Sequence, residues 1–168
     1  ALDHAARHGV IHRDVKPDNV LFDDDDNAIL TDFGIANARF QGRLTAGGRA
    51  MGTPHYMAPE QAMGRVVDAR SDLYAVGVML YECLSGVLPF EGADGFAVAH
   101  RQVHEMPRDL ASLAPTVPAP LAALAMRCLE KDPAVRPQRG HDLADALYAW
   151  LATQGVGDGT ARAARPLA

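Results

Sequence analysis

One segment, from about Asp72 to Leu84, constrains the fold more than any other part of this sequence. Read as a helix, it carries apolar side chains around nearly its whole circumference rather than along one stripe. Such a helix needs neighbours on all sides, so we expect it at the centre of a domain. Ser71 is the expected N-cap, and Gly86 with Pro89 ends the helix. The apolar positions are Leu73, Ala75, Val76, Val78, Met79, Leu80 and Cys83.

Further helices are predicted on both sides of this segment. Residues 2–6 resemble the end of a helix that Gly9 terminates, and residues 96–104 form a looser helical pattern. Two later segments carry the i, i+3, i+4, i+7 spacing of a helix packed on a core. Their stripes are Leu121, Leu124, Ala125, Cys128 and Leu129 in the first, and Leu143, Ala146, Leu147, Trp150 and Leu151 in the second. The fold is therefore predicted to be mainly helical.

The strand content is predicted to be small. Residues 10–11 favour a short strand, and residues 20–22 and 28–30 favour a hairpin around the turn Asp23–Asn27. The four aspartates of that turn lack the alternating ligands, central glycine and final glutamate of a calcium loop. We therefore interpret the turn as a solvated hairpin tip.

Composition excludes several classes of protein. The 168 residues suit one compact domain, and a net charge of −5 argues against a dedicated nucleic-acid binder. Cys83 and Cys128 lie in apolar runs without metal-type spacing, which predicts two buried thiols in a reducing, cytoplasmic compartment. No run approaches the ~20 apolar residues of a membrane span.

The chemistry of the chain is concentrated in the run His12–Asn19, which reads HRDVKPDN. Asp14, Lys16 and Asn19 lie in one turn-like segment that leads into the predicted hairpin. The second strand of that hairpin leads to Asp32-Phe33-Gly34, so it can bring Asp32 back beside Asn19. Two oxygen ligands at one place suit a hard cation such as Mg²⁺.

These motifs, followed by Ala58-Pro59-Glu60, resemble the catalytic loop, the DFG motif and the end of the activation segment of protein kinases. The resemblance covers about residues 1–151 and is nearest to bacterial serine/threonine kinases of the eukaryotic (Hanks) type. It implies an α+β, mainly α fold: the C-terminal lobe of a kinase, a helical bundle with a small β-hairpin at the catalytic loop. Residues 152–168 are expected to form a flexible tail.

The resemblance implies a role for each residue of the catalytic loop. Asp14 would be the catalytic base that accepts the proton of a protein Ser or Thr hydroxyl, and Lys16 would offset charge on the transferring phosphoryl group. Thr53 would bond within the Asp14–Lys16 pair, which favours serine/threonine over tyrosine substrates.

The cofactors implied are ATP and Mg²⁺, with Mn²⁺ as an alternative metal. Asn19 and Asp32 would hold the metal, Lys16 would face the phosphates and Leu21 would pack under the adenine ring.

Regulation is implied by Arg13, which would pair with a phosphate on the activation segment. Thr45 is the only hydroxyl residue between Gly34 and Thr53 and is the candidate site of autophosphorylation, with a second kinase molecule as partner. The sequence is equally consistent with Thr45 as an ordinary residue of a mobile loop.

Supporting residues are implied as well. His12 and Phe33 would pack in the regulatory spine, and Asp72 would anchor the backbone of the catalytic loop. Glu60 and Arg136 would form a buried ion pair that ties the activation segment to the late helices. Glu82 and Asp18 would face the peptide cleft and favour basic residues near the target.

The sequence departs from a whole kinase domain because it contains no GxGxxG loop and no VAIK-like lysine. We therefore expect the N-terminal lobe to be absent and the chain alone to transfer phosphate poorly. The alternative is a catalytically impaired remnant that binds other proteins; a small-molecule phosphotransferase fits the activation segment less well. A membrane anchor in a full-length protein is compatible with this sequence, although this chain has no such segment.

Overall fold

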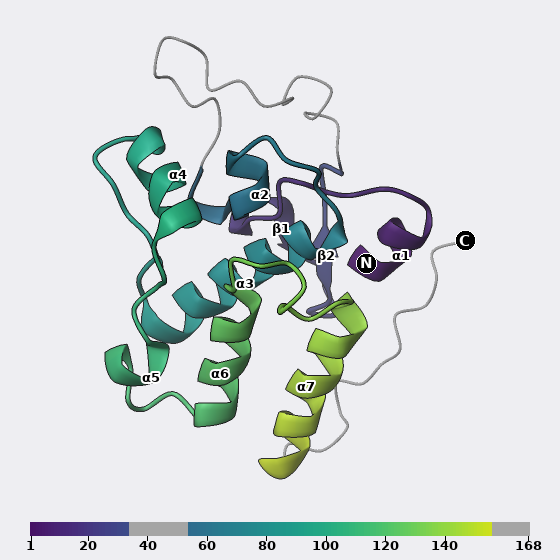
Figure 1. The fold of residues 1–168 in the computed structure, drawn as a ribbon. Coiled ribbons are helices and arrows are strands. Elements are labelled where there is room, and N and C mark those ends of the chain that lie inside the picture. Colours follow the sequence, from purple (N-terminus) through teal and green to yellow (C-terminus); the bar gives the residue numbers. More distant parts are fainter. Residues whose placement is uncertain (34–53, 156–168) are drawn as a thin grey trace.

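Helix α3, Ala69–Ser85, lies in the middle of the fold and contacts α1, α5, α6 and the 3-10 turn η2. The computed structural model describes residues 1–33 and 54–155 (Figure 1). Helices α6 and α7 lie side by side below α3 in that view. The helices are α1 (Leu2–Arg7), α2 (Pro59–Ala62), α3, α4 (Gly95–His104), α5 (Leu110–Leu113), α6 (Ala119–Cys128) and α7 (Gly140–Thr153). The remaining elements are η1 (Pro17–Asn19), β1 (Val20–Phe22), β2 (Ala28–Leu30) and η2 (Pro54–Tyr56).

Helix α3 begins earlier than the sequence pattern predicted. Its N-cap is Asp68, whose side chain accepts the backbone N–H of Arg70, so the prediction of Ser71 as the cap was wrong. An aspartate caps as well as a serine, and Ser71 instead donates its hydroxyl to the buried Glu60 at 2.5 Å. The helix ends at Gly86, where a φ of 75° requires the left-handed conformation that glycine adopts most easily.

The hydrophobic core forms around α3 in two clusters. Tyr74, Val78 and Tyr81 of α3 pack against α6, while Leu73 packs against Cys128 and Leu143. Gly77 lies so close to Cys128 that an added Cβ would overlap the cysteine Cβ. The absence of a side chain at Gly77 therefore lets α3 and α6 cross at close range.

The two cysteines differ in burial. Cys128 is fully buried, and burial raises the pKa of its thiol to about 12. Cys83, in the last part of α3, is exposed, so the prediction that both thiols are buried was wrong for Cys83. Apolar neighbours along the chain predict burial of a residue only where its helix face packs against another element. The face of α3 that carries Cys83 is exposed.

Helix α7 packs through fewer residues than its apolar stripe suggested. Leu143 is buried and Leu147 is partly buried against the cluster of Leu73 and Cys128, whereas Ala146 is exposed. The helix continues to Thr153, two residues beyond the expected end of the domain. Residues 156–168 lie outside the described residues.

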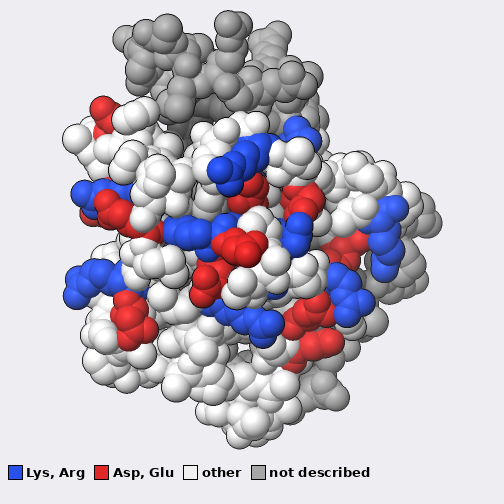
Figure 2. All heavy atoms as spheres, in the orientation of Figure 1, with Lys and Arg blue, Asp and Glu red and all other residues white. Residues whose placement is uncertain are grey.

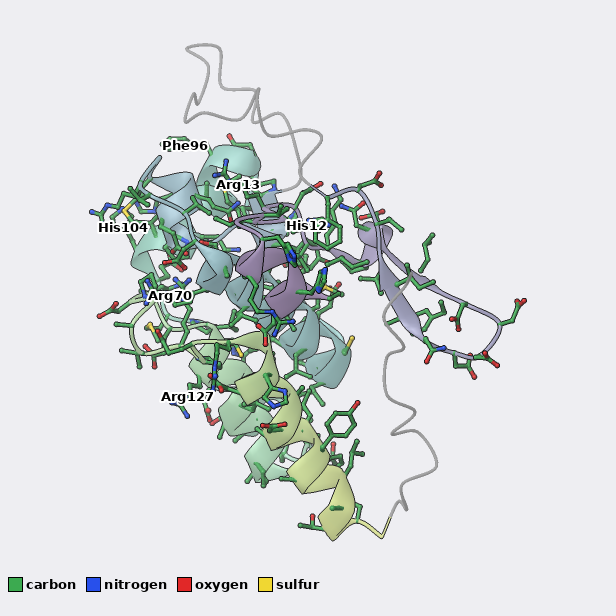
Figure 3. All side chains as sticks on the ribbon, turned by 90° about the vertical axis from the view of Figure 1, so that its right-hand side faces the viewer. His12, Arg13, Arg70, Phe96, His104 and Arg127 are labelled. Atoms are coloured by element: carbon green, nitrogen blue, oxygen red, sulfur yellow. The ribbon has the colours of Figure 1, made fainter. Side chains whose placement is uncertain are left out.

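The hairpin has the predicted strands. Strand β1 pairs antiparallel with β2, with Val20 opposite Leu30 and Phe22 opposite Ala28. At its tip Asp23 accepts the backbone N–H groups of Asp25 and Asn27, and hydrogen bonds from Asn27 lower the pKa of the Asp23 carboxyl. Figure 3 shows the hairpin projecting away from the helical body. Residues 10–11 are irregular, so the short strand predicted there was wrong: within the described residues the sheet has two strands.

The surface carries charges of both signs. Figure 2 shows acidic and basic side chains interspersed over one face, without a continuous basic stripe on that face. In residues 1–33 and 54–155, no helix combines the length and the apolar character needed to cross a membrane.

Candidate active site

The candidate catalytic loop, His12–Asn19, is anchored to the central helix by Asp72. The Asp72 carboxylate accepts the backbone N–H of His12 at 2.9 Å and that of Arg13 at 2.7 Å. Only 3% of Asp72 is exposed, and this burial raises its pKa although the two N–H groups oppose the rise. Since Asp72 lies in the first turn of α3, the loop is fixed to the helix in the middle of the fold.

His12 joins the catalytic loop to the end of the hairpin. Its side chain is fully buried, with Nε2 at 2.7 Å from the Thr31 carbonyl oxygen. The other ring nitrogen, Nδ1, lies 3.3 Å from the backbone N–H of Asp14. Nε2 must donate and Nδ1 must accept, and the neutral tautomer with hydrogen on Nε2 meets both demands. The ring also packs on Phe33, with centroids 4.6 Å apart. His12 and Arg13 are labelled in Figure 3.

Asp14, Lys16 and Asn19 form one polar cluster. The Lys16 ammonium lies 2.9 Å from Oδ2 of Asp14, and the Asn19 side-chain amide donates to the same oxygen at 3.3 Å. That amide also donates to the Asp14 carbonyl at 2.7 Å. The Asp14 side chain remains 44% exposed, so the carboxylate is held in place yet open to a partner.

Asn19 is tied to the segment that carries Asp32. The Asn19 carbonyl accepts the backbone N–H of Thr31 at 2.9 Å and its hydroxyl at 3.3 Å, which brings the adjacent Asp32 to this side of the loop. Asp32 is exposed and has a φ of 60°, unusual for a residue with a side chain. The Asn19 nitrogen is engaged with Asp14, which leaves the amide oxygen as the atom for a cation. An amide oxygen and a carboxylate fit the oxygen donors that Mg²⁺ prefers.

Clusters of three or more His, Cys, Asp or Glu side chains suited to a metal ion are absent from residues 1–33 and 54–155. An amide oxygen such as that of Asn19 lies outside those four residue types, so the Asn19–Asp32 pair is a different kind of arrangement. Mg²⁺ commonly completes its shell with water and phosphate oxygens and needs only one or two protein ligands.

Glu60 and Arg136 form a buried, bidentate ion pair between α2 and the segment before α7. Two guanidinium nitrogens of Arg136 lie 2.8 and 2.9 Å from the two carboxylate oxygens of Glu60. Burial raises the pKa of Glu60, but hydrogen bonds from Arg136 and Ser71 outweigh burial and leave the pKa lowered. The guanidinium also stacks over the ring of Tyr74 at 4.8 Å, which fills the space around the pair.

A second buried network was not predicted from the sequence. Lys131 donates to the Tyr74 hydroxyl at 3.2 Å, and this hydroxyl donates to the Gln102 side chain. Gln102, fully buried on α4, then donates to the carbonyl of His55 at 2.6 Å. The Lys131 ammonium also lies 4.3 Å from the centre of the Phe90 ring. The sequence offers no signal for this network because it joins α3, α4, η2 and the connection between α6 and α7, which are distant along the chain.

An acidic pair lies next to the turn η2. The Tyr56 hydroxyl donates to Glu82 at 2.7 Å. Burial raises the pKa of Tyr56, with further contributions from Glu82 and from the charge of Asp18. Glu82 and Asp18, 64 positions apart by their residue numbers, therefore act on the same tyrosine.

Three further residues, Leu21, Thr45 and Thr53, were predicted to belong to the site. Leu21, predicted to pack under adenine, is 54% exposed on β1, beside the exposed Phe22 and Ile29. Thr45 and Thr53 lie outside the described residues.

Comparison with known proteins gives the same family. The family described as "Protein kinase domain" matches residues 1–148. The chain is 46% identical over 145 residues to the DNA damage-responsive serine/threonine-protein kinase RqkA of Deinococcus radiodurans, covering 86% of the chain and 22% of that protein. It is 46% identical over 151 residues to the serine/threonine-protein kinase pkn2 of Myxococcus xanthus, covering 84% of the chain and 18% of that protein. A probable serine/threonine-protein kinase of Clostridium acetobutylicum is 36% identical over 147 residues, covering 88% and 22%.

The chain thus spans about a fifth of the length of these curated relatives. The matched region takes in the catalytic loop, the hairpin and nearly all of the helical body. On this match, the chain belongs to the protein kinase domain family.

Proposed function

We propose that this chain, over residues 1–151, is the C-terminal lobe of a bacterial Hanks-type serine/threonine kinase that transfers the γ-phosphoryl group of ATP to Ser or Thr hydroxyls of proteins. The observation that carries the proposal is the cluster in which Lys16 and Asn19 both bond Oδ2 of Asp14. This arrangement orients one carboxylate at an exposed position, as a catalytic base requires.

Asp14 would act through its second oxygen. Both side-chain contacts fall on Oδ2, so Oδ1 is the atom directed to the substrate hydroxyl. The hydroxyl oxygen would form a bond to the γ-phosphorus while the bond between that phosphorus and the ADP oxygen breaks, and the proton would pass to Asp14. Lys16, 2.9 Å from Asp14, would lie close enough to offset charge on the transferred group.

Asn19 and Asp32 would hold Mg²⁺, or Mn²⁺ in its place, and Leu21 would contact the adenine ring of ATP. The metal, when bound, would neutralise phosphate charge. The hydrogen bonds between Asn19 and Thr31 support this assignment because they join the two ligand-bearing segments. ATP as the phosphate donor and the free cysteines favour a cytoplasmic location.

Regulation and substrate choice would involve residues around the same loop. Arg13 would pair with a phosphate on Thr45, placed there by a second kinase molecule, and Thr53 would complete the pocket of the phosphoacceptor. Glu82 and Asp18 would favour basic residues near the target, and their closeness is supported by the fact that both raise the pKa of Tyr56 in η2.

The test is transfer of labelled phosphate from ATP to a protein substrate rich in Ser and Thr. It is run with this chain and with the protein encoded by the complete reading frame. Asp14→Asn should lower the rate by about 10²–10⁴-fold, the usual contribution of a general base. Asp24→Asn, at the exposed hairpin tip, is the matched control and should keep the full rate. An active enzyme in which Asp14→Asn equals the wild type would contradict the proposal.

A further inference from the structure

The peptide bond that precedes Asp14 is held by side chains at both of its polar atoms. Its N–H lies 3.3 Å from Nδ1 of His12. Its carbonyl, which belongs to Arg13, accepts the side-chain amide of Gln61 at 2.9 Å. Fixing both atoms fixes the plane of this peptide and therefore the position of the Asp14 Cα.

Arg13 needs such support because its backbone is strained. Its φ of 67° lies in the left-handed region that residues with a Cβ rarely adopt. Strained residues persist where the surrounding structure holds them from several sides. Asp72 holds the N–H of Arg13 and Gln61 holds its carbonyl, so two side chains from different elements fix one strained residue.

Gln61 is itself firmly placed. Its side-chain oxygen accepts the backbone N–H of Ala58 at 3.0 Å, which orients the amide so that its nitrogen faces the loop. It follows Glu60, which is anchored by the bidentate pair with Arg136. A rigid path therefore leads from the core through Gln61 to the peptide before Asp14.

We propose that Gln61 is a positioning residue for the catalytic base: it fixes the Arg13 carbonyl and thereby the Asp14 carboxylate relative to α2 and the 54–62 segment that α2 ends. The proposal rests on the proposed function of Asp14. It assigns to the 54–62 segment a direct link to the catalytic loop, 48 positions away along the chain.

The substitution Gln61→Glu tests the hydrogen bond from Gln61 to the Arg13 carbonyl. A glutamate keeps an oxygen that accepts from Ala58, but it places a second oxygen, in place of the amide donor, against the Arg13 carbonyl. Gln61→Met removes both hydrogen bonds with little change in shape. The matched control is Gln154→Glu, the same chemical change at an exposed position after α7.

The first readout is kinetic, in the active kinase. We expect Gln61→Glu and Gln61→Met to lower kcat by about 10-fold with KM for ATP unchanged, because displacement of a catalytic group by a fraction of an ångström impairs positioning. Gln154→Glu should leave both constants at the wild-type values. Unchanged kcat in both Gln61 variants would overturn the proposal.

The second readout needs no activity. Amide hydrogen exchange at Asp14 N–H should be at least several-fold faster in Gln61→Glu than in the wild type, with exchange in the interior of α6 unchanged. If Gln61→Glu does not fold, Gln61→Asn shortens the same side chain without adding charge, and the same readouts apply. Wild-type exchange at Asp14 N–H in folded variants would refute the positioning role. An inactive wild type with faster Asp14 exchange in the variants would count against the proposed function alone.

Discussion

The carboxylate of Asp3 accepts the backbone N–H of Gly140 at 2.6 Å, a contact between residues 137 positions apart. The same carboxylate accepts the N–H of His141 at 2.8 Å. These N–H groups belong to the first turn of α7 and have no partner within their own helix. Gly140 also permits the approach, because a Cβ there would lie 3.0 Å from the Asp3 oxygen. Asp3 therefore acts as a cap supplied from another helix, and it joins α1 to α7.

Removal of this cap should weaken the domain measurably. We expect Asp3→Ala to lower the free energy of unfolding by about 1 kcal/mol, the usual cost of losing a helix cap. Urea denaturation followed by circular dichroism measures the change. Asp24→Ala, at the hairpin tip, removes an exposed carboxylate elsewhere and should change stability by less than about 0.5 kcal/mol. Equal stabilities for the two variants would mean that Asp3 contributes nothing as a cap.

The buried pair of Glu60 and Arg136 should be far more costly to break. Arg136→Met leaves the Glu60 carboxylate buried without its partner, and we expect a loss of about 3–5 kcal/mol. The exposed pair of Arg139 and Asp142 provides the comparison, since solvent screens it and Arg139→Ala should cost far less than Arg136→Met. Denaturant midpoints of the two variants measure the difference. A similar loss in both would show that burial does not control the contribution of these pairs.

The crossing of α3 and α6 predicts an unusual result for a glycine within a helix. Helix propensity alone would make Gly77→Ala stabilising by about 1 kcal/mol. The overlap with the Cβ of Cys128 reverses this sign, and we expect a net loss of about 1–3 kcal/mol from overpacking. The same substitution in a Cys128→Gly background should cost less, because the opposing Cβ is gone. A stabilised single variant would show that the two helices separate easily.

Lys131 predicts a pH dependence of stability. Burial lowers its pKa from 10.5 to about 8, so the unfolded chain binds the proton more tightly than the folded one. The resulting penalty is fully present below pH 8 and is relieved as the pH rises from about 8 towards 10.5. Above pH 10 the raised pKa values of Tyr56, Tyr74 and Tyr81 act in the opposite direction, since the unfolded chain ionises first.

The measurement is urea denaturation of the wild type and of Lys131→Met at about pH 7.5 and 9.5. The free energy of unfolding of the wild type should rise relative to that of the variant between these two values. An equal change in the free energy of unfolding of the two proteins between these pH values would show that the Lys131 ammonium is solvated in the folded state.

Local patterns predicted those parts of the fold that depend on neighbouring residues. The hairpin followed from two short β-prone runs around an aspartate-rich turn, and the central position of α3 followed from its apolar circumference. The kinase motifs then pointed to the loop that carries Asp14. The contacts of Asp72, and of Glu60 with Arg136, have the form that this resemblance implied.

What the sequence did not predict depends on which helix faces meet. Cys83 and Cys128 sit in similar apolar runs, yet only the face of Cys128 meets another helix. A serine side chain can cap a helix, but the Ser71 hydroxyl donates its hydrogen bond to the buried Glu60 instead. Gln61 carries no local signal, because its contact with Arg13 exists only after α2 and the loop are brought together.

The sequence separation of the loop from its anchors also concerns synthesis of the chain. His12 lies 60 positions before Asp72, so at about 5–20 residues per second its partner leaves the ribosome roughly 3–12 s later. During that interval the turn at Arg13 lacks the Asp72 carboxylate that holds its backbone N–H. A nascent chain of this kind therefore carries Asp14, Lys16 and Asn19 several seconds before it carries the aspartate that anchors their loop.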